Sequence, residues 1–116
     1  MNLLLFDVDL TLINSGGAGR RSMMLAFEKL FGARNGFDKV NFAGRTDVLI
    51  LKDALAHSDL QWSQDIQTDF KKLYLDNLSI EIHKPGGDKH VEPGVIKLLN
   101  ILSDQPDLKL GLLTGN

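Results

Sequence analysis

Two aspartates near the N-terminus have the residue type and the spacing to do chemistry. Asp7 and Asp9 come directly after the apolar run Leu3–Phe6, and Thr11 follows two residues later. A continuous apolar run of this kind is typical of a parallel strand that is covered on both faces. Carboxylates are costly to bury beside such a strand unless a cation or a reaction uses them. Because ligand sites in open α/β sheets lie at the carboxyl ends of strands, we expect a site here.

The chemistry that suits these two carboxylates is phosphoryl transfer with Mg²⁺. Oxygen ligands of this kind are the ones that Mg²⁺ prefers. In an extended segment both side chains would share a face, whereas a loop beginning at Val8 would redirect Asp9 and keep its carbonyl near Asp7. Asp7 could attack a phosphoryl group, while Asp9 protonates the leaving oxygen and then deprotonates water. The alternative is a pair of aspartates that cap a turn after the strand.

A second polar segment, Thr114-Gly115-Asn116, follows the apolar run Leu108–Leu113. If that run is a parallel strand of the same sheet, the segment lies at the same edge as Asp7. Thr114 offers a hydroxyl, and glycine lets backbone N–H groups approach a phosphate closely. Alone the segment would be an ordinary turn, but paired with Asp7 it predicts a phosphate cradle.

The elements between the two predicted strands are helical. Apolar residues recur at helical spacing in four stretches, which centre on Met23–Phe31, Val48–Leu55, Ile66–Asn77 and Val95–Leu102. Thr46 or Asp47 is expected to cap the second helix, and Ser63 begins the third. The last helix is expected to bury its apolar stripe.

This order of elements predicts an α/β fold. Two strands joined through helices form a parallel pair, and the connection needs only one helix. We therefore expect a three-layer, Rossmann-like core of residues 1–15 and 86–116, of which these are the first two strands. The remaining residues, 16–85, are expected to form an inserted helical cap.

Composition excludes several classes of protein. The 116 residues carry a formal net charge of −2, without the basic excess of a nucleic-acid binder. There is no cysteine, so disulfides and thiolate metal sites are excluded. The N-terminal apolar run is too short for a membrane span and lacks the features of a signal peptide, so we expect a cytoplasmic protein. The histidines His57, His83 and His90 lack metal-ligand spacing and are expected to have surface or structural roles.

The whole chain resembles the haloacid dehalogenase superfamily. The shared pattern is an apolar strand, Asp-x-Asp-x-Thr from Asp7 to Thr11, a helical insertion, and a strand that ends in Thr-Gly-Asn. The segments Ala43–Asp47 and Val91–Val95 are similar to parts of the phosphoglycolate-phosphatase-like branch, namely the cap segment that helps to select substrate and the start of the return helix.

The resemblance implies a Mg²⁺-dependent phosphatase that hydrolyses a small phosphorylated metabolite through an aspartyl phosphate. In that family, Asp7 corresponds to the nucleophile and a metal ligand. Asp9 corresponds to the acid/base, and its carbonyl to a second ligand. Thr114 and the amides after it correspond to the phosphate cradle. Arg45 is a candidate for substrate contact, with a solvated arginine at a helix start as the alternative.

The chain also departs from the family pattern. Leu10 stands where many members have glycine. The pattern continues with a lysine that balances charge and an acidic pair that completes the metal shell, and neither is among the 116 residues. Lys109 lies within the second strand and does not replace that lysine.

Three other functions stay open at this stage. A phosphotransferase or mutase would use the same nucleophile. A dehalogenase is disfavoured, because that reaction needs neither Mg²⁺ nor an acid/base at Asp9. The third is a catalytically incomplete fragment, whose unpaired sheet edges would favour self-association.

We predict that the 116-residue chain alone has negligible phosphatase activity, because it lacks the expected lysine and acidic pair. The measurement is Mg²⁺-dependent hydrolysis of a generic phosphate ester, with the intact mass of the same sample compared with 12.8 kDa. Robust turnover that the Asp7→Asn substitution abolishes, in a sample of that mass, would contradict the prediction.

Overall fold

The chain divides into two compact units in the computed structural model, which describes residues 1–115. The first, here called the strand unit, comprises Met1–Gly17 and Pro85–Thr114. The second, the helical unit, comprises Ala18–Lys84 together with Gly115. The expected cap comprises residues 16–85. The continuous segment of the helical unit, Ala18–Lys84, begins two residues later and ends one residue earlier.

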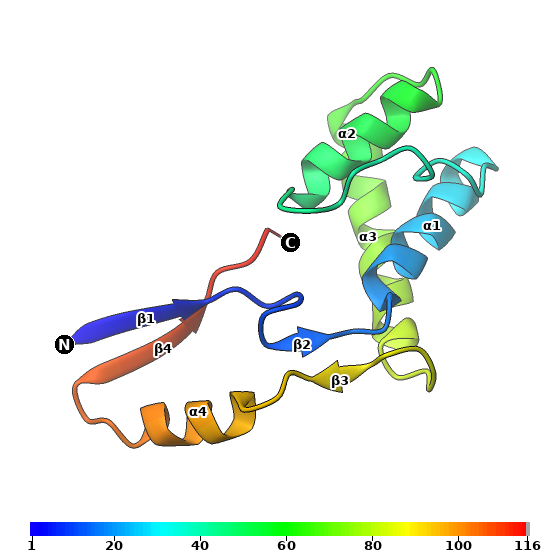
Figure 1. Ribbon diagram of the computed structural model, residues 1–116. Coiled ribbons are helices and arrows are strands. Elements are labelled where there is room, and N and C mark those ends of the chain that lie inside the picture. Colours follow the sequence, from blue (N-terminus) through cyan, green and yellow to red (C-terminus); the bar gives the residue numbers. More distant parts are fainter. Residues whose placement is uncertain (116) are drawn as a thin grey trace. The chain divides into compact units, whose positions relative to one another are not determined.

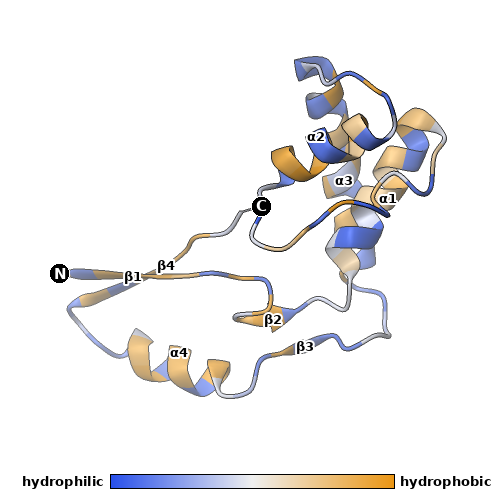
Figure 2. Ribbon diagram, turned by 45° about the horizontal axis from the view of Figure 1, so that its top comes forward, coloured by the Kyte–Doolittle hydropathy of each residue, from blue (hydrophilic) through white to orange (hydrophobic). Residues whose placement is uncertain are grey.

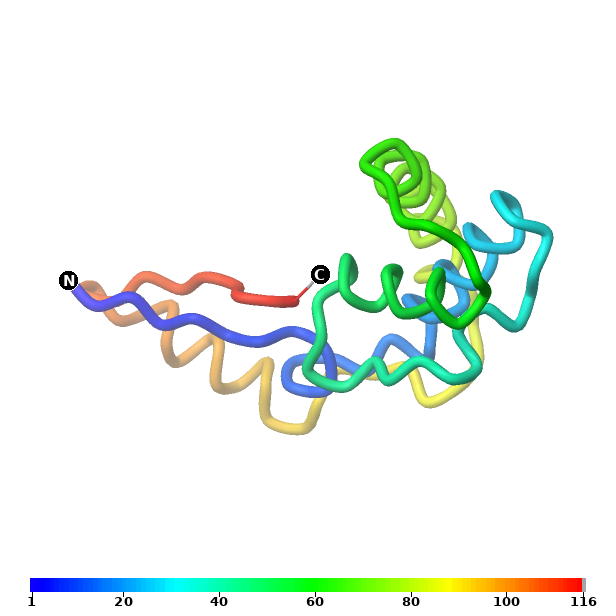
Figure 3. The backbone as a smooth tube through the Cα atoms, turned by 90° about the horizontal axis from the view of Figure 1, so that it is seen from above, coloured from blue at the N-terminus to red at the C-terminus, as the bar shows by residue number. Residues whose placement is uncertain are grey.

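A parallel pair of strands forms the strand unit's sheet (Figures 1 and 3). β1 (Asn2–Phe6) pairs with β4 (Leu108–Leu112) in a register that runs from Asn2↔Leu108 to Phe6↔Leu112. The helix α4 (Val95–Ser103) comes just before β4 and contacts it. The predicted parallel pair is therefore confirmed.

A short antiparallel ribbon is the second pairing in the strand unit. β2 (Ile13–Asn14) pairs with β3 (His90–Val91), and the Glu92 amide extends the pairing by donating to the Leu12 carbonyl at 2.9 Å. The sequence does not predict this ribbon, because strands of two residues are too short to show an alternating pattern.

The apolar side chains of the strand unit are largely exposed. Leu3 of β1 is 65% exposed, and α4 has no buried residue although much of its surface is apolar (Figure 2). Leu98, expected in the buried stripe of α4, is 45% exposed. The expectation of burial is thus wrong for this unit as described, because two strands and one helix provide too few neighbours to surround these side chains.

Three helices form the helical unit: α1 (Ala18–Phe31), α2 (Asp47–His57) and α3 (Gln64–Glu81). The Thr46 side chain caps α2 by accepting from the Leu49 amide, so the cap is Thr46 rather than Asp47. Ser63 caps α3, as expected, by accepting from the Ile66 amide at 3.1 Å. No helix in the described part of the chain is long and apolar enough to cross a membrane.

The core of the helical unit is built around aromatic rings. The Phe27 and Phe37 ring centroids lie 5.2 Å apart in an edge-to-face arrangement, and Phe37 also contacts Phe70 of α3. Gly36 is required here, since a Cβ atom would lie 2.4 Å from the Phe27 ring. Three helices and the loop before α2 supply the buried apolar residues, which are Met23, Ala26, Phe27, Phe37, Val40, Ile50, Leu51, Ala54, Leu55, Phe70 and Tyr74.

One carboxylate is buried in this unit. Glu81, at the end of α3, is only 5% exposed, and its two oxygens bind different cations. Oε2 accepts from Arg21 Nε of α1 at 3.0 Å, and Oε1 accepts from Lys84 Nζ at 2.5 Å. These hydrogen bonds, first that from Lys84 and then that from Arg21, lower the pKa of Glu81 below its ordinary value of 4.5. Glu81 thus joins α1 to the end of α3.

We predict that Glu81→Gln destabilises the helical unit at neutral pH and has little effect in acid. Because the folded-state pKa is lowered, the ionised carboxylate stabilises the fold above about pH 4.5, and this is lost as the pH falls through the lowered pKa. The measurement is the urea midpoint of both proteins at neutral and at acid pH. Glu28→Gln, which removes the exposed pair with Arg34, is the control and should change the midpoint less. Equal effects of the two substitutions would contradict the assignment.

Candidate functional site

A tight loop follows β1 and shapes the Asp-x-Asp-x-Thr segment. The carbonyl of Val8 accepts from the amides of Thr11, Leu12 and Ile13 at 2.9–3.3 Å, and the Leu10 amide donates to the Ile13 carbonyl at 2.8 Å. Leu10 has a φ of 59°, in the left-handed region that favours glycine. Of the two arrangements that the sequence leaves open, an extended segment and a loop beginning at Val8, the structure has the loop, which brings the chain back toward the end of β1.

This loop brings Thr11 back to Asp7. The Thr11 hydroxyl donates to Asp7 Oδ2 at 3.0 Å, while Asp7 Oδ1 accepts no hydrogen bond from residues 1–115. Asp7 is exposed at the end of β1. One oxygen of the carboxylate is thus oriented by a hydroxyl and the other stays accessible, which is a suitable arrangement for a nucleophile or a metal ligand.

The end of β4 reaches the same edge of the sheet. The last strand pair is Phe6↔Leu112, and the Leu113 amide donates to the Phe6 carbonyl at 2.7 Å. Asp7 and Thr114 therefore follow the paired ends of neighbouring parallel strands. The expectation that these two segments share one edge agrees with this register.

Asp9 is also exposed, and its backbone forms an isolated bridge with Ile13. Asp7 and Asp9 supply oxygen ligands, which Mg²⁺ prefers. Both side chains are exposed to solvent, which suits an ion that keeps several water ligands. Among residues 1–115, no group of three or more His, Asp or Glu side chains is placed to hold a metal ion. The two aspartates could therefore supply part of a magnesium shell.

The other predicted site residues belong to the helical unit or lie outside the described chain. Gly115 groups with the helical unit, where its carbonyl accepts from the Asp47 amide at 3.3 Å. Asn116 lies outside the described residues. The structure thus provides no geometry for the complete phosphate cradle.

Arg45 precedes the Thr46 cap of α2 and folds back along that helix. Its guanidinium Nη1 donates to Asp53 Oδ2, and both side chains are partly buried. A guanidinium has five N–H donors, so this ion pair leaves donors for a second acceptor. The sequence does not predict the role of Asp53. The two residues are eight positions apart, Arg45 lies in the loop before α2, and no periodic pattern relates a loop residue to a helix residue.

Comparison with known proteins finds a similarity among solved structures. No protein-family model matches the chain, and no curated protein matches it. Among solved structures, a predicted phosphoglycolate phosphatase from Haemophilus somnus 129PT aligns with 97% of this chain, with a TM-score of 0.61 and 19% sequence identity. The chain spans 50% of the length of that protein.

At this level of identity, the similarity establishes the fold. The chain has an α/β fold with the first two parallel strands of a Rossmann-like core and an inserted helical unit, as the sequence predicted. The structural neighbour also agrees with the sequence resemblance to haloacid dehalogenase-like phosphatases at the level of fold.

We predict that Leu10→Gly leaves the protein as stable as before or stabilises it by up to about 1 kcal/mol. The left-handed conformation costs a side-chain-bearing residue about 1–2 kcal/mol, and glycine avoids this while adding about 0.5–1 kcal/mol of backbone entropy cost. The measurement is the free energy of unfolding in urea. The matched control is Leu12→Gly, at a half-buried position with ordinary φ, which should cost about 2 kcal/mol. Equal losses at both positions would refute the explanation.

Proposed function

We propose that this chain carries the nucleophile half of a Mg²⁺-dependent phosphatase site that acts on a small phosphate monoester. The observation that carries the proposal is the hydrogen bond from Thr11 to Asp7 Oδ2 at the end of β1, beside the end of β4. It leaves Oδ1 of an exposed carboxylate available at the edge of the sheet where α/β proteins bind ligands. Similarity in fold to a predicted phosphoglycolate phosphatase supports the same reaction class.

The proposed reaction has two steps. An oxygen of Asp7 attacks the phosphorus atom, the ester P–O bond breaks, and the leaving oxygen takes a proton from Asp9. Water then attacks the phosphorus of the aspartyl phosphate and gives a proton to Asp9. The bond to Asp7 breaks, so that inorganic phosphate leaves and both carboxylates return to their starting states.

Thr11 has a positioning role in this mechanism. Its hydroxyl fixes Oδ2, so that the carboxylate does not rotate freely while the other oxygen attacks. The chain turns at Val8 between the two aspartates, of which Asp7 is proposed to act as nucleophile and Asp9 to serve the leaving group. The Asp-x-Asp-x-Thr spacing therefore follows from the loop geometry.

Mg²⁺ is the proposed cofactor, with a carboxylate oxygen of Asp7 and the backbone carbonyl of Asp9 as ligands. When bound, the ion reduces repulsion between the attacking carboxylate and the phosphate. Exposure of both aspartates supports a site in which water completes much of the shell.

The remaining site residues are assigned by position. Thr114 and the backbone that follows it, including Gly115 and Asn116, are proposed to bind the phosphoryl oxygens. Arg45 is proposed to contact the rest of the substrate through the donors that Asp53 does not use. The substrate class is a small phosphorylated metabolite, and the proposed location is the cytoplasm.

A trapping experiment tests the nucleophile without requiring turnover. The protein is incubated with acetyl phosphate and Mg²⁺, quenched in acid, and weighed by intact-mass spectrometry. We expect a gain of one phosphoryl group on Asp7, located by borohydride reduction of the acyl phosphate and peptide mapping. Chelation of the metal or Asp7→Asn should reduce the gain below detection. Asp9→Asn should still be phosphorylated, because acetate is a good leaving group that needs no proton from Asp9.

The matched control is Asp107→Asn, an exposed aspartate just before β4 that has no proposed role. It should be phosphorylated like the wild type. No Mg²⁺-dependent mass gain, or a gain that persists in Asp7→Asn, would overturn the assignment of Asp7. Transfer of the trapped group to a sugar phosphate instead of water would identify a phosphotransferase.

A further inference from the structure

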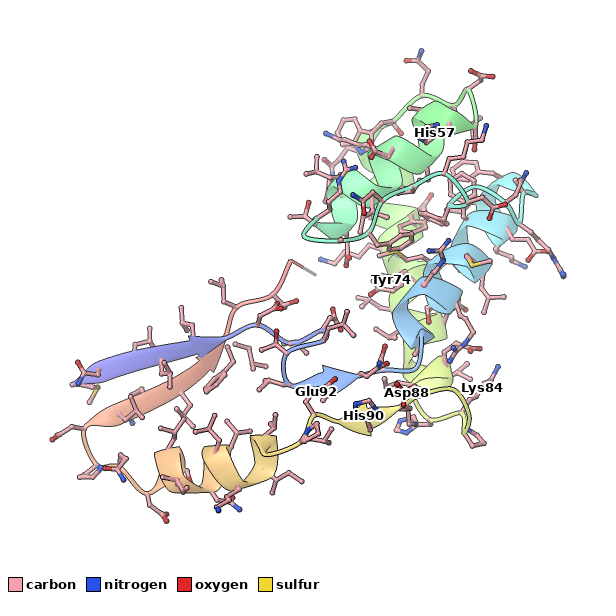
Figure 4. The ribbon with its side chains drawn as sticks, in the orientation of Figure 1. His57, Tyr74, Lys84, Asp88, His90 and Glu92 are labelled. Atoms are coloured by element: carbon pink, nitrogen blue, oxygen red, sulfur yellow. The ribbon has the colours of Figure 1, made fainter. Side chains whose placement is uncertain are left out.

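His90 of β3 lies between two carboxylates on its own segment (Figure 4). Its Nδ1 lies 2.6 Å from the Asp88 carbonyl oxygen and 3.4 Å from Asp88 Oδ1. Its Nε2 lies 3.3 Å from Glu92 Oε1. The ring therefore spans the segment from the loop before β3 to the residue after it.

Both ring nitrogens face oxygen acceptors. A neutral imidazole carries only one N–H, so one nitrogen would direct a lone pair at an oxygen. If the proton is on Nδ1, that lone pair faces the carboxylate of Glu92. Only the imidazolium can donate to both sides.

We propose that His90 is a proton-operated brace of the β2–β3 ribbon, which ties Asp88 to Glu92 when charged and releases Glu92 when neutral. This proposal is independent of the proposed phosphatase function, since it uses none of the residues assigned to catalysis.

Glu92 is the residue through which the brace affects the backbone. Its amide donates to the Leu12 carbonyl at 2.9 Å, and its carbonyl accepts from the Val95 amide at 3.2 Å, where α4 begins. Asp88, on the other side, ends the loop that leads from the helical unit. Holding both residues with one ring therefore links the ribbon to the start of α4.

The ribbon is tightly packed beside this brace. Gly16 has a φ of +65°, and a Cβ atom there would lie 3.1 Å from Lys89 Cβ and 3.3 Å from the Gly86 carbonyl oxygen. Gly87 likewise approaches the Gly16 carbonyl. The turn after β2 thus lies against the loop before β3, within a few residues of His90.

The charges around the ring favour protonation. In the described part of the chain, the ion pairs of His90 are with Asp88 and Glu92. Across the ribbon its partner is Asn14, which is uncharged, and the neighbouring cation Lys89 packs its Cβ against Gly16. The Asp88 carbonyl, and then the Glu92 carboxylate, raise the pKa of His90 above its ordinary value of 6.5.

Because the pKa of His90 is raised, the stability that the brace gives to the ribbon should fall as the pH rises. A raised pKa in the folded state means that the brace is fully present below about pH 6.5 and is lost as the pH rises through the raised value. The ribbon should therefore loosen from neutral toward alkaline pH. Because the ribbon pairs β2 with β3, its loosening would separate these two segments of the strand unit.

The test is NMR on the full chain across this pH range. We expect the His90 ring to titrate above its ordinary pKa, with both nitrogens protonated at the acid end. Protection of the Glu92 amide against hydrogen exchange, corrected for the intrinsic pH dependence, should fall about two- to five-fold over the same titration, as for one exposed ion pair. An ordinary pKa, or protection that does not change with that titration, would overturn the proposal.

Two variants separate the brace from a merely structural role. His90→Gln keeps one donor for Asp88 but cannot charge, so Glu92 protection should be low and independent of pH. Glu92→Gln should lower the pKa of His90. His57→Gln, in α2 of the other unit, is the matched control and should retain the wild-type pH dependence. The same pH dependence in His90→Gln as in the wild type would refute the brace.

Discussion

The parallel pairing of β1 with β4 is the constraint on which the candidate site depends. Its register ends at Phe6↔Leu112, and the Leu113 amide continues it by one hydrogen bond to the Phe6 carbonyl. Parallel strands cannot be joined by a tight turn, so the chain must leave the sheet and return. The connection here contains the three helices of the helical unit. Residues about a hundred positions apart in sequence consequently emerge at one edge.

The two units differ in how much of their apolar surface they bury. The helical unit surrounds Phe27, Phe37 and Leu55 with three helices and a loop, and it even buries the carboxylate of Glu81 by pairing it with two cations. The strand unit has the apolar composition of a core but exposes much of it, including Leu3 and Leu112. The energetic contributions of the two units therefore differ, since the hydrophobic stabilisation scales with the apolar area removed from water.

Polar side chains in this molecule act mainly by orienting other groups. Thr11 orients one oxygen of Asp7, and Asp53 holds the guanidinium of Arg45 against α2. His90 links the two residues that flank it along β3. In each case a local hydrogen bond sets the direction of a group whose chemistry the residue type alone already suggested, and direction determines what that group can reach.

The sequence by itself determined the four helices and the two long strands, and it predicted where the candidate site lies. The apolar runs at Leu3–Phe6 and Leu108–Leu113 and the 3.6-residue periodicities between them are local signals, as is the Asp-x-Asp-x-Thr spacing. Only the tertiary structure decided the contacts between distant segments: the β2–β3 ribbon, the ion pairs of Glu81 and the partner of Arg45. It also decided that no residue of α4 is fully buried in the described chain. Burial depends on which neighbours surround a side chain. A periodic pattern in the sequence shows which face of a helix is apolar, but it does not show which other segments cover that face.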